Sequence, residues 1–121
     1  MRLLVVDDDP GIVNILSISL KESSYDVDEA NDGVEAVELL QKNSYDVAII
    51  DAIMPKMNGA EVCNFIKSHY PHIYVIGISG YPQSLEKLKN EGADICFTKP
   101  FSVVQINRAI KNHFTSPLPN S

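Results

Sequence analysis

Three short runs of apolar residues interrupt an otherwise mixed sequence: LLVV at 3–6, VAII at 47–50 and IYVIGI at 73–78. Such runs are too short for core helices, and their β-branched residues favour parallel strands that are buried on both faces. The stretches YDVDEA at 25–30 and ADICFT at 93–98 are less apolar and predict two further strands. The pattern therefore predicts five strands along the chain.

The segments between these runs have the spacing of amphipathic helices. Ile12, Leu16 and Leu20 recur every four residues, so a helix would place them on one face. Three further helices are predicted to begin where a capping residue is followed three positions later by Glu or Gln. These pairs are Asp32 with Glu35, Asn58 with Glu61, and Ser102 with Gln105. The alternation predicts an α/β fold, a (βα)5 doubly wound five-stranded parallel sheet with helices on both faces.

Length and the chain ends set the expected domain limits. The chain has 121 residues, which suits one domain. We expect the domain to span residues 1–114 and residues 115–121, which contain two prolines and no periodicity, to form a tail or the start of a linker. No apolar run approaches the roughly 18 residues of a membrane span, and the start lacks a secretory signal. We therefore expect a soluble, cytoplasmic protein without a membrane partner.

Charge and cysteine usage narrow the function classes. The formal net charge of −6 argues against direct contact between this domain and nucleic acid. Residues 1–80 hold 13 Asp and Glu against 5 Lys and Arg, whereas residues 81–121 hold 3 against 5. Cys63 and Cys96 lie in apolar surroundings without a C-x-x-C pair, and both are expected to be buried thiols. The acidic chemistry is thus concentrated early in the chain.

Polar residues follow four of the five predicted strands. In an open parallel sheet, ligands bind beyond the carboxyl ends of the strands. Carboxylates crowded at that edge repel one another and need a cation, and hard oxygen ligands without nearby histidine or cysteine favour Mg²⁺. The pattern therefore predicts a Mg²⁺ site beside one hydroxyl and one ammonium group. The residues at the strand ends are Asp7, Asp8 and Asp9, then Asp51, Ser79 and Lys99.

Taken singly, each of these residues has a simpler role open to it. Asp9 precedes a proline and suits the N-cap of a helix. Asp51 opens the loop DAIMPKMNG and could begin a turn, as could Ser79 with the glycine after it. Lys99 could be a surface lysine. These alternatives stay open residue by residue, but the joint position at four strand ends favours a common site.

Four stretches together, VVDDDP, IIDAIMPKMNG, GISG and TKPF, resemble the receiver domain of bacterial two-component response regulators. The resemblance extends from Leu3 to about His113 and implies a flavodoxin-like strand order, 2-1-3-4-5. It implies that Asp51 is the phosphoacceptor and that Ser79 donates a hydrogen bond to a phosphoryl oxygen. Lys99 would pair with the phosphoryl group or with Asp51 itself.

The resemblance also implies the metal ligands and the kind of reaction. Asp8 would bind Mg²⁺ directly and Asp7 largely through water, while Asp51 and the backbone carbonyl of Ile53 would complete the protein ligands. Such a protein is not an enzyme that acts on other molecules; it catalyses its own phosphorylation and slow dephosphorylation. The peptide before Pro100 is commonly cis in the family, which the sequence alone leaves undecided.

The implied partners follow from the same resemblance. A sensor histidine kinase or a phosphotransfer protein would donate the phosphoryl group, and an output domain or separate partner would receive the signal. Phosphorylation could also drive a homodimer. The family's usual contact face corresponds to the helix, strand and helix within residues 82–113, which carry a basic excess from Lys87, Lys89, Arg108 and Lys111.

Several positions depart from the family pattern. Cys96 stands three residues before Lys99, where many members carry a Tyr or Phe that swings inward after phosphorylation, so that aromatic switch is absent. Gly80 replaces the usual small side chain and leaves the site open. Ile53 and Tyr81 flank the pocket, and neither is an acid or an amide that could position an attacking water. We therefore expect the signal to pass from Ser79 through residues 80–82.

Two rival interpretations remain from the sequence. An aspartyl-phosphate hydrolase of the haloacid dehalogenase type also ends its first strand in D-x-D, here within Asp7 to Asp9, but it expects Thr or Val where this chain has Gly11. A degenerate receiver would bind partners without being phosphorylated, which the full set of site residues argues against. His69 and His72 are expected to be surface residues.

Overall fold

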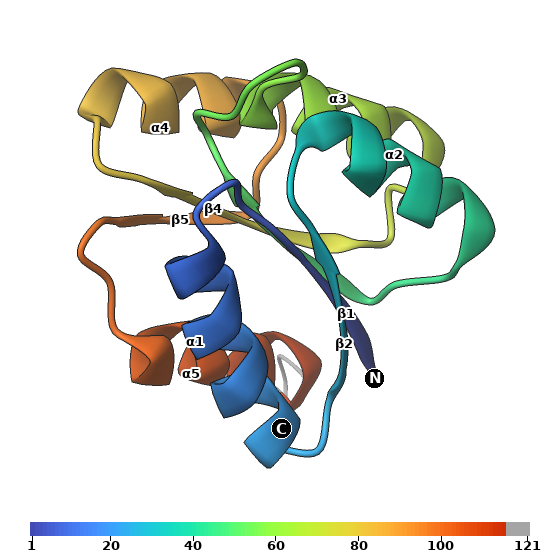
Figure 1. Cartoon of the computed structure of the whole chain (residues 1–121), viewed down its shortest axis with the longest axis vertical. Helices are drawn as coiled ribbons and strands as arrows, with labels where there is room; N and C mark the ends of the chain where they lie inside the picture. The colour runs from blue at the N-terminus through green and yellow to red at the C-terminus, as the bar shows by residue number, and fades with distance from the viewer. Residues whose placement is uncertain (116–121) are drawn as a thin grey trace, which may run out of the picture.

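The computed structural model describes residues 1–115, which alternate between strand and helix (Figure 1). The strands form one parallel sheet in the order β2-β1-β3-β4-β5, which confirms the predicted (βα)5 fold and its flavodoxin-like order. The elements are β1 (Arg2–Val6), α1 (Pro10–Glu22), β2 (Asp26–Ala30), α2 (Gly33–Lys42), β3 (Val47–Asp51), α3 (Gly59–His69), β4 (Tyr74–Ser79), α4 (Pro82–Asn90), β5 (Ile95–Thr98) and α5 (Val103–Thr115).

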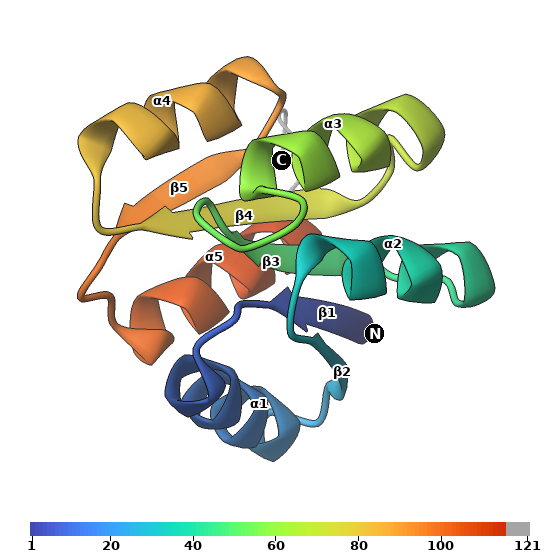
Figure 2. The same cartoon turned by 45° about the horizontal axis from the view of Figure 1, so that its top comes forward.

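Helices cover both faces of the sheet. Figures 1 and 2 show α1 and α5 together on one face and α2, α3 and α4 on the other. Successive side chains of a strand point to opposite faces. Leu3 and Val5 of β1 accordingly pack in the core under α1 and α5, whereas Leu4 and Val6 pack in the core under the other three helices. This double burial explains why the run LLVV lacks polar residues.

The central strands gave clearer sequence signals than the edge strands, and their positions in the sheet explain this difference. The central strands β1, β3 and β4 are buried along almost their whole length. The edge strands β2 and β5 are mostly half-buried or exposed. Polar residues are tolerated at those edges, which is why DVDEA and ICFT gave the weaker strand signals.

The predicted helix starts agree with the structure. Asp9, Asp32 and Asn58 are the N-caps of α1, α2 and α3, and α5 begins directly after Ser102. Each cap satisfies an amide that has no partner within its helix. The capping hydrogen bonds run from the amides of Gly11, Glu35 and Glu61 to the side-chain oxygens of Asp9 (2.9 Å), Asp32 (2.8 Å) and Asn58 (2.9 Å).

Helix α5 continues through Thr115, the first residue of the expected tail. Its last turn is held against the sheet, because the ring of His113 stacks on that of Tyr74 with centroids 4.0 Å apart. Phe114 adds an edge-on contact to the same tyrosine at 6.3 Å. The rest of the expected tail lies outside the described residues, so the domain limits of 1–114 stay a prediction.

Two expectations from composition can be compared with the structure. Cys63 is fully buried, and burial raises the pKa of its thiol to about 11. Cys96, on the edge strand β5, is only half-buried, so the expectation of two buried thiols holds for one of them. Within residues 1–115, none of the helices has the length and apolar character needed to cross a membrane.

Candidate functional site

Four neighbouring strands bring the predicted polar residues to one edge of the sheet. Asp7 and Asp8 follow β1, Asp51 is the last residue of β3, and Ser79 is the last residue of β4. Lys99 directly follows β5, and its amide donates a hydrogen bond to the carbonyl of Ser79 at 2.8 Å. The parallel arrangement makes this possible, because all carboxyl ends then lie at the same edge.

The three aspartates form a compact acidic cluster. One carboxylate oxygen from each of Asp7, Asp8 and Asp51 lies within 4.8 Å of the others. Asp7 is 1% exposed and Asp51 5%, whereas Asp8 is exposed to solvent. Three carboxylates this close repel one another strongly, and their hard oxygens are the donors that Mg²⁺ prefers. The donor set therefore fits a divalent cation that enters from the side of Asp8.

Lys99 connects two of these carboxylates. Its Nζ lies 2.8 Å from Oδ1 of Asp51 and 3.4 Å from Oδ2 of Asp7. The lysine is half-buried, so these contacts are less screened by water than a surface ion pair would be. The peptide between Lys99 and Pro100 is cis. A single ammonium group thus faces the end of β3 and the end of β1 at once.

Burial and charge set the ionisation of the site. Burial raises the pKa of Asp7 to about 6, against the opposing effects of the Asp9 amide and of Lys99. Burial also raises the pKa of Asp51, although the hydrogen bond and charge of Lys99 work against it. Burial alone would lower the pKa of Lys99, but its contacts with Asp51 and Asp7 outweigh this and raise it. At neutral pH the buried carboxylates therefore ionise at a cost in folding free energy.

Replacing Asp7 by asparagine should stabilise the metal-free protein at neutral pH. The pKa of about 6 exceeds the ordinary value of 3.8, so between these values the folded state binds more protons than the unfolded state. Protonation of Asp7 therefore adds to the free energy of unfolding. This contribution is fully present below pH 3.8 and is lost as the pH rises through about 6. The shift corresponds to at most about 3 kcal/mol, and the lost contact with Lys99 reduces the gain to about 1–2 kcal/mol.

Urea unfolding of Asp7→Asn and of the unaltered protein in a chelating buffer measures this gain. The variant should be more stable at about pH 7.5, and its advantage should shrink at about pH 4.5, where Asp7 of the unaltered protein takes up its proton. Asparagine keeps the oxygen that accepts the hydrogen bond of the Asp9 amide, so that contact should survive. Equal stability of the two proteins at the higher pH would contradict the expectation.

The hydroxyl of Ser79 is coupled to the start of α4. Ser79 is 1% exposed, and its Oγ accepts a hydrogen bond from the amide of Tyr81 at 3.1 Å. The hydroxyl proton remains available to a ligand oxygen, because a serine hydroxyl both donates and accepts. A methyl group added to Gly80 would meet only Cβ of Lys99, at 3.9 Å, so the site is open on this side as expected.

The two residues predicted to flank the pocket both face solvent. Ile53 is 51% exposed and Tyr81 63% exposed. The amide of Ile53 also contributes a hydrogen bond to the carboxylate of Asp51, which favours the ionised form. The role of the Ile53 carbonyl as a metal ligand stays a prediction.

Gly59, the last residue of the loop sequence DAIMPKMNG, lies against the end of β3, a contact that the sequence did not indicate. A Cβ atom on Gly59 would lie 2.3 Å from the carbonyl oxygen of Asp51 and 2.7 Å from Cα of Ala52. Its amide donates a hydrogen bond to the carbonyl of Ala52 at 2.9 Å, which closes the β3–α3 loop, residues 52–58, at its base. Any side chain here would displace the backbone that carries Asp51.

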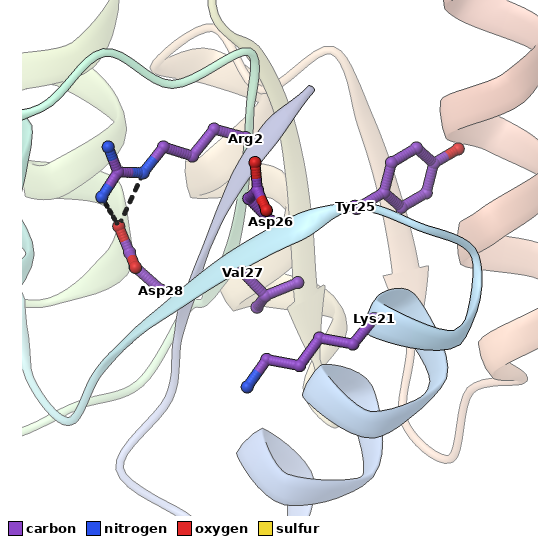
Figure 3. Close-up of a pocket in the computed structure, with 6 residues that line it drawn as sticks. All are labelled: Arg2, Lys21, Tyr25, Asp26, Val27 and Asp28. Carbon is purple, nitrogen blue, oxygen red and sulfur yellow. Dashed lines mark hydrogen bonds and ion pairs between the residues drawn. The ribbon is translucent and has the colours of Figure 1, made fainter.

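A second hollow lies at the opposite, amino end of the strands and has no comparable chemistry. Figure 3 shows Arg2 paired with Asp28, while Lys21, Tyr25 and Asp26 point in different directions. The contacts of Arg2 with Asp28 measure 2.8 and 3.0 Å, so its guanidinium is already engaged. His69 and His72 are exposed, as expected. The carboxyl ends of the strands therefore remain the candidate site.

Comparison with known proteins gives a consistent result. The family model described as the response regulator receiver domain matches residues 3–111. The alkaline phosphatase synthesis transcriptional regulatory protein PhoP of Bacillus subtilis (strain 168) is 33% identical over 112 residues, which cover 91% of this chain and 47% of that protein. Response regulator MprA of Mycobacterium leprae (strain TN) is 33% identical over 113 residues, covering 92% of this chain and 50% of that protein.

A solved structure agrees over nearly the whole domain. The response regulator protein TrrA of Thermotoga maritima, in complex with Mg²⁺ and BeF, aligns with a TM-score of 0.84 and 32% identity, covering 92% of this chain and 96% of that one. The chain spans about half the length of the two curated relatives it matches.

Proposed function

Because the chain belongs to the receiver domain family of two-component response regulators, we propose that Asp51 accepts a phosphoryl group in a Mg²⁺-dependent reaction. The observation that carries this proposal is the ammonium group of Lys99, which lies 2.8 Å from the buried carboxylate of Asp51. That carboxylate in turn clusters with those of Asp7 and Asp8. A nucleophile, a cationic partner and a cation-binding cluster thus share one edge of the sheet.

Asp51 supplies the nucleophile. One of its carboxylate oxygens attacks phosphorus in line with the leaving group, the new O–P bond forms as the bond to the donor breaks, and an acyl phosphate results. Lys99 then balances charge on the transferred group, and the hydroxyl of Ser79 donates a hydrogen bond to one of its oxygens. Phosphoryl transfer needs little covalent assistance, so positioning and charge are the main contributions of these residues.

The acidic cluster supplies the metal ligands. Asp8 and Asp51 would bind Mg²⁺ directly, with the carbonyl of Ile53, and Asp7 would act largely through water. When bound, the ion neutralises charge on the carboxylates and on the phosphoryl oxygens. The structure of TrrA, which was solved in complex with Mg²⁺ and BeF, supports this choice of cation.

In this proposal, the protein catalyses its own phosphorylation and slow dephosphorylation and is not an enzyme that acts on other molecules. The acyl phosphate hydrolyses slowly, because neither Ile53 nor Tyr81 carries an acid or an amide that could position an attacking water. The phosphorylated state would therefore have a finite lifetime, which suits a transient signal.

Incubation with Mg²⁺ and acetyl phosphate tests the proposed function. Intact-mass measurement should show the gain of one phosphoryl group, and a chelator should prevent it. A degenerate receiver would gain none. A hydrolase of the haloacid dehalogenase type would turn over phosphate esters instead of accumulating a single acyl phosphate.

The proposed donor is a sensor histidine kinase or a phosphotransfer protein. An apolar groove beside the site supports a protein donor. It lies next to Lys99 and is lined by Ile12 and Ile15 of α1, Phe101 of the β5–α5 loop and Val103 at the start of α5. Ile15 is 57% exposed. A protein that presents a phosphohistidine to Asp51 must cover the loops around this groove.

The proposed recipient of the signal is an output domain or a separate partner. Phosphorylation would also drive the formation of a homodimer if a second copy of the chain is that partner. The length of the relatives supports an output domain, because this chain matches about half of each. The family supports a cytoplasmic location, and its match over residues 3–111 supports receiver limits close to 1–114. The formal net charge of −6 argues against direct contact between this domain and nucleic acid.

The basic residues of the expected contact face lie on the two helices that flank the edge strand β5. Lys87 of α4 lines a pocket with Ile53 and Ser84. Arg108 and Lys111 of α5 line a groove with Ser19 of α1, on the other face of the sheet (Figure 1). The proposed output face consists of α4, the edge strand β5 and α5, and its basic residues lie on both sides of that strand.

Phosphorylation should alter the start of α4 through Ser79. The Oγ of Ser79 accepts a hydrogen bond from the amide of Tyr81, the residue that precedes α4. Movement of the hydroxyl toward a phosphoryl oxygen would therefore displace Tyr81. Hydrogen exchange with and without beryllofluoride, a phosphoryl mimic, measures this. We expect changed protection across residues 80–92, in addition to the loops of the site.

Asp51→Asn is the control for this experiment, because it should show no change on addition of beryllofluoride. Changes confined to the loops around Asp7 and Asp51, with residues 80–92 unaltered, would exclude the route through Ser79.

A further inference from the structure

Gly33 begins α2 and lies against the tip of the β3–α3 loop. A Cβ atom at this position would lie 2.4 Å from the carbonyl oxygen of Met57 and 2.6 Å from its Cβ. Both distances are far below van der Waals contact, and one of them involves backbone, which cannot rotate away as a side chain can. The turn before α2 and the loop that carries Ile53 are therefore in contact through backbone on both sides.

Two further contacts hold the same loop tip. Nζ of Lys56 lies 3.3 Å from Oδ2 of Asp32, the residue before Gly33. Lys56 has a φ of +68°, in the left-handed region that ordinary side chains rarely occupy. The amide of Met57 donates a hydrogen bond to the carbonyl of Pro55 at 2.8 Å. The tip is thus a tight turn held against the neighbouring loop.

The loop is fixed at its base as well as at its tip. At the base, Gly59 donates to the carbonyl of Ala52. Helix α2 is itself fixed, because Asp32 caps it and Ala36 and Leu40 are buried in the core. If Gly33 gained a side chain, the loop rather than the helix would have to move. Residues 53–57 would absorb the displacement, and they include the proposed carbonyl ligand of Ile53.

We propose that Gly33 is a positioning residue for the metal site, because the absence of a side chain there lets the turn before α2 hold the β3–α3 loop, and with it the Ile53 carbonyl, in place. The inference rests on the proposed function. It adds a residue of α2, on an element that contributes no group to the site itself.

Gly33→Ala tests this proposal by titration of the metal-free protein with Mg²⁺, followed by calorimetry or NMR. We expect the dissociation constant for Mg²⁺ to rise at least about tenfold while the protein still unfolds cooperatively. Alanine favours helix over glycine, so a loss of affinity would not reflect weaker helix formation. An unchanged dissociation constant in the folded variant would overturn the proposal.

Gly77→Ala is a matched control. The added methyl group would lie 2.7 Å from Cδ1 of Leu88 and 3.1 Å from Sγ of Cys96, in the core beneath α4. This variant should lose stability but keep the dissociation constant of the unaltered protein within about twofold. If Gly77→Ala weakened Mg²⁺ binding as much as Gly33→Ala, general destabilisation would explain both, and the positioning role would be wrong.

Asp32→Asn keeps the proposal testable if Gly33→Ala fails to fold. Asparagine can still cap α2 through Oδ1 but loses its charged contact with Lys56. Amide exchange of Ile53, Met54, Lys56 and Met57 in the metal-free variant should be at least about twofold faster, and unchanged exchange would overturn the proposal. Failure of the unaltered protein to bind Mg²⁺ would instead contradict the proposed function.

Discussion

The Asp51→Asn variant should gain no phosphoryl group from acetyl phosphate and Mg²⁺, whereas the unaltered protein should gain one. The amide of asparagine is not a nucleophile for phosphorus, and Asp51 is the carboxylate that contacts Lys99 most closely, at 2.8 Å. Asparagine nearly preserves the shape of the side chain, so the sheet should tolerate it. Intact-mass measurement before and after treatment with hydroxylamine, which cleaves acyl phosphates, decides the result.

Asp9→Asn is the matched control for that experiment. Asp9 lies in the adjacent loop, and asparagine caps a helix about as well as aspartate does, so this variant should still gain one phosphoryl group. A hydroxylamine-sensitive phosphate on Asp51→Asn would show that a different carboxylate, such as Asp8, is the acceptor.

Mg²⁺ affinity should depend on Asp8 and hardly at all on Asp9, although the two residues are adjacent. A carboxylate oxygen of Asp8 lies within 4.8 Å of carboxylate oxygens of Asp7 and Asp51. The carboxylate of Asp9 instead accepts a hydrogen bond from the amide of Gly11 at the start of α1. Asp8→Ala should weaken Mg²⁺ binding by at least about tenfold, or 1.4 kcal/mol, because the site loses a charged oxygen ligand.

The two alanine variants should also differ in stability. Asp9→Ala should destabilise the protein by about 1 kcal/mol through the lost cap and leave Mg²⁺ affinity nearly unchanged. Asp8→Ala should cost no stability without metal, because it relieves repulsion within the acidic cluster. Calorimetric titration and urea unfolding measure both quantities, and equal losses of Mg²⁺ affinity in the two variants would contradict the assignment of Asp8.

Much of the fold followed from local signals. The central strands are readily predicted because burial on both faces favours apolar residues along them. Asp7, Asp51 and Ser79 are buried polar residues at or just after the carboxyl ends of these strands, which is why they indicate a site. The end of α5 was less evident, because its last turn is stabilised by the stacking of His113 on Tyr74, a contact that no local pattern reveals.

Some features of the site likewise depend on tertiary packing and could not be predicted from the sequence. That Asp7 is buried while its neighbour Asp8 is exposed depends on how the chain leaves β1, which the sequence DDD does not indicate. The closeness of Gly33 to Met57 joins residues 24 positions apart and depends on the packing of two loops. The separation of Lys87 from Arg108 likewise arises because α4 and α5 cover opposite faces of the sheet.

The arrangement around Lys99 has a consequence for proton exchange with solvent. When all are ionised, the three carboxylates and one ammonium group carry a net charge of −2, which one divalent cation would balance. Asp7, with its pKa of about 6, removes one of those charges when it takes up a proton. At the proposed metal site, protons and Mg²⁺ would therefore compete for the same negative charge, and Mg²⁺ binding below that pH would release a proton into the surrounding buffer.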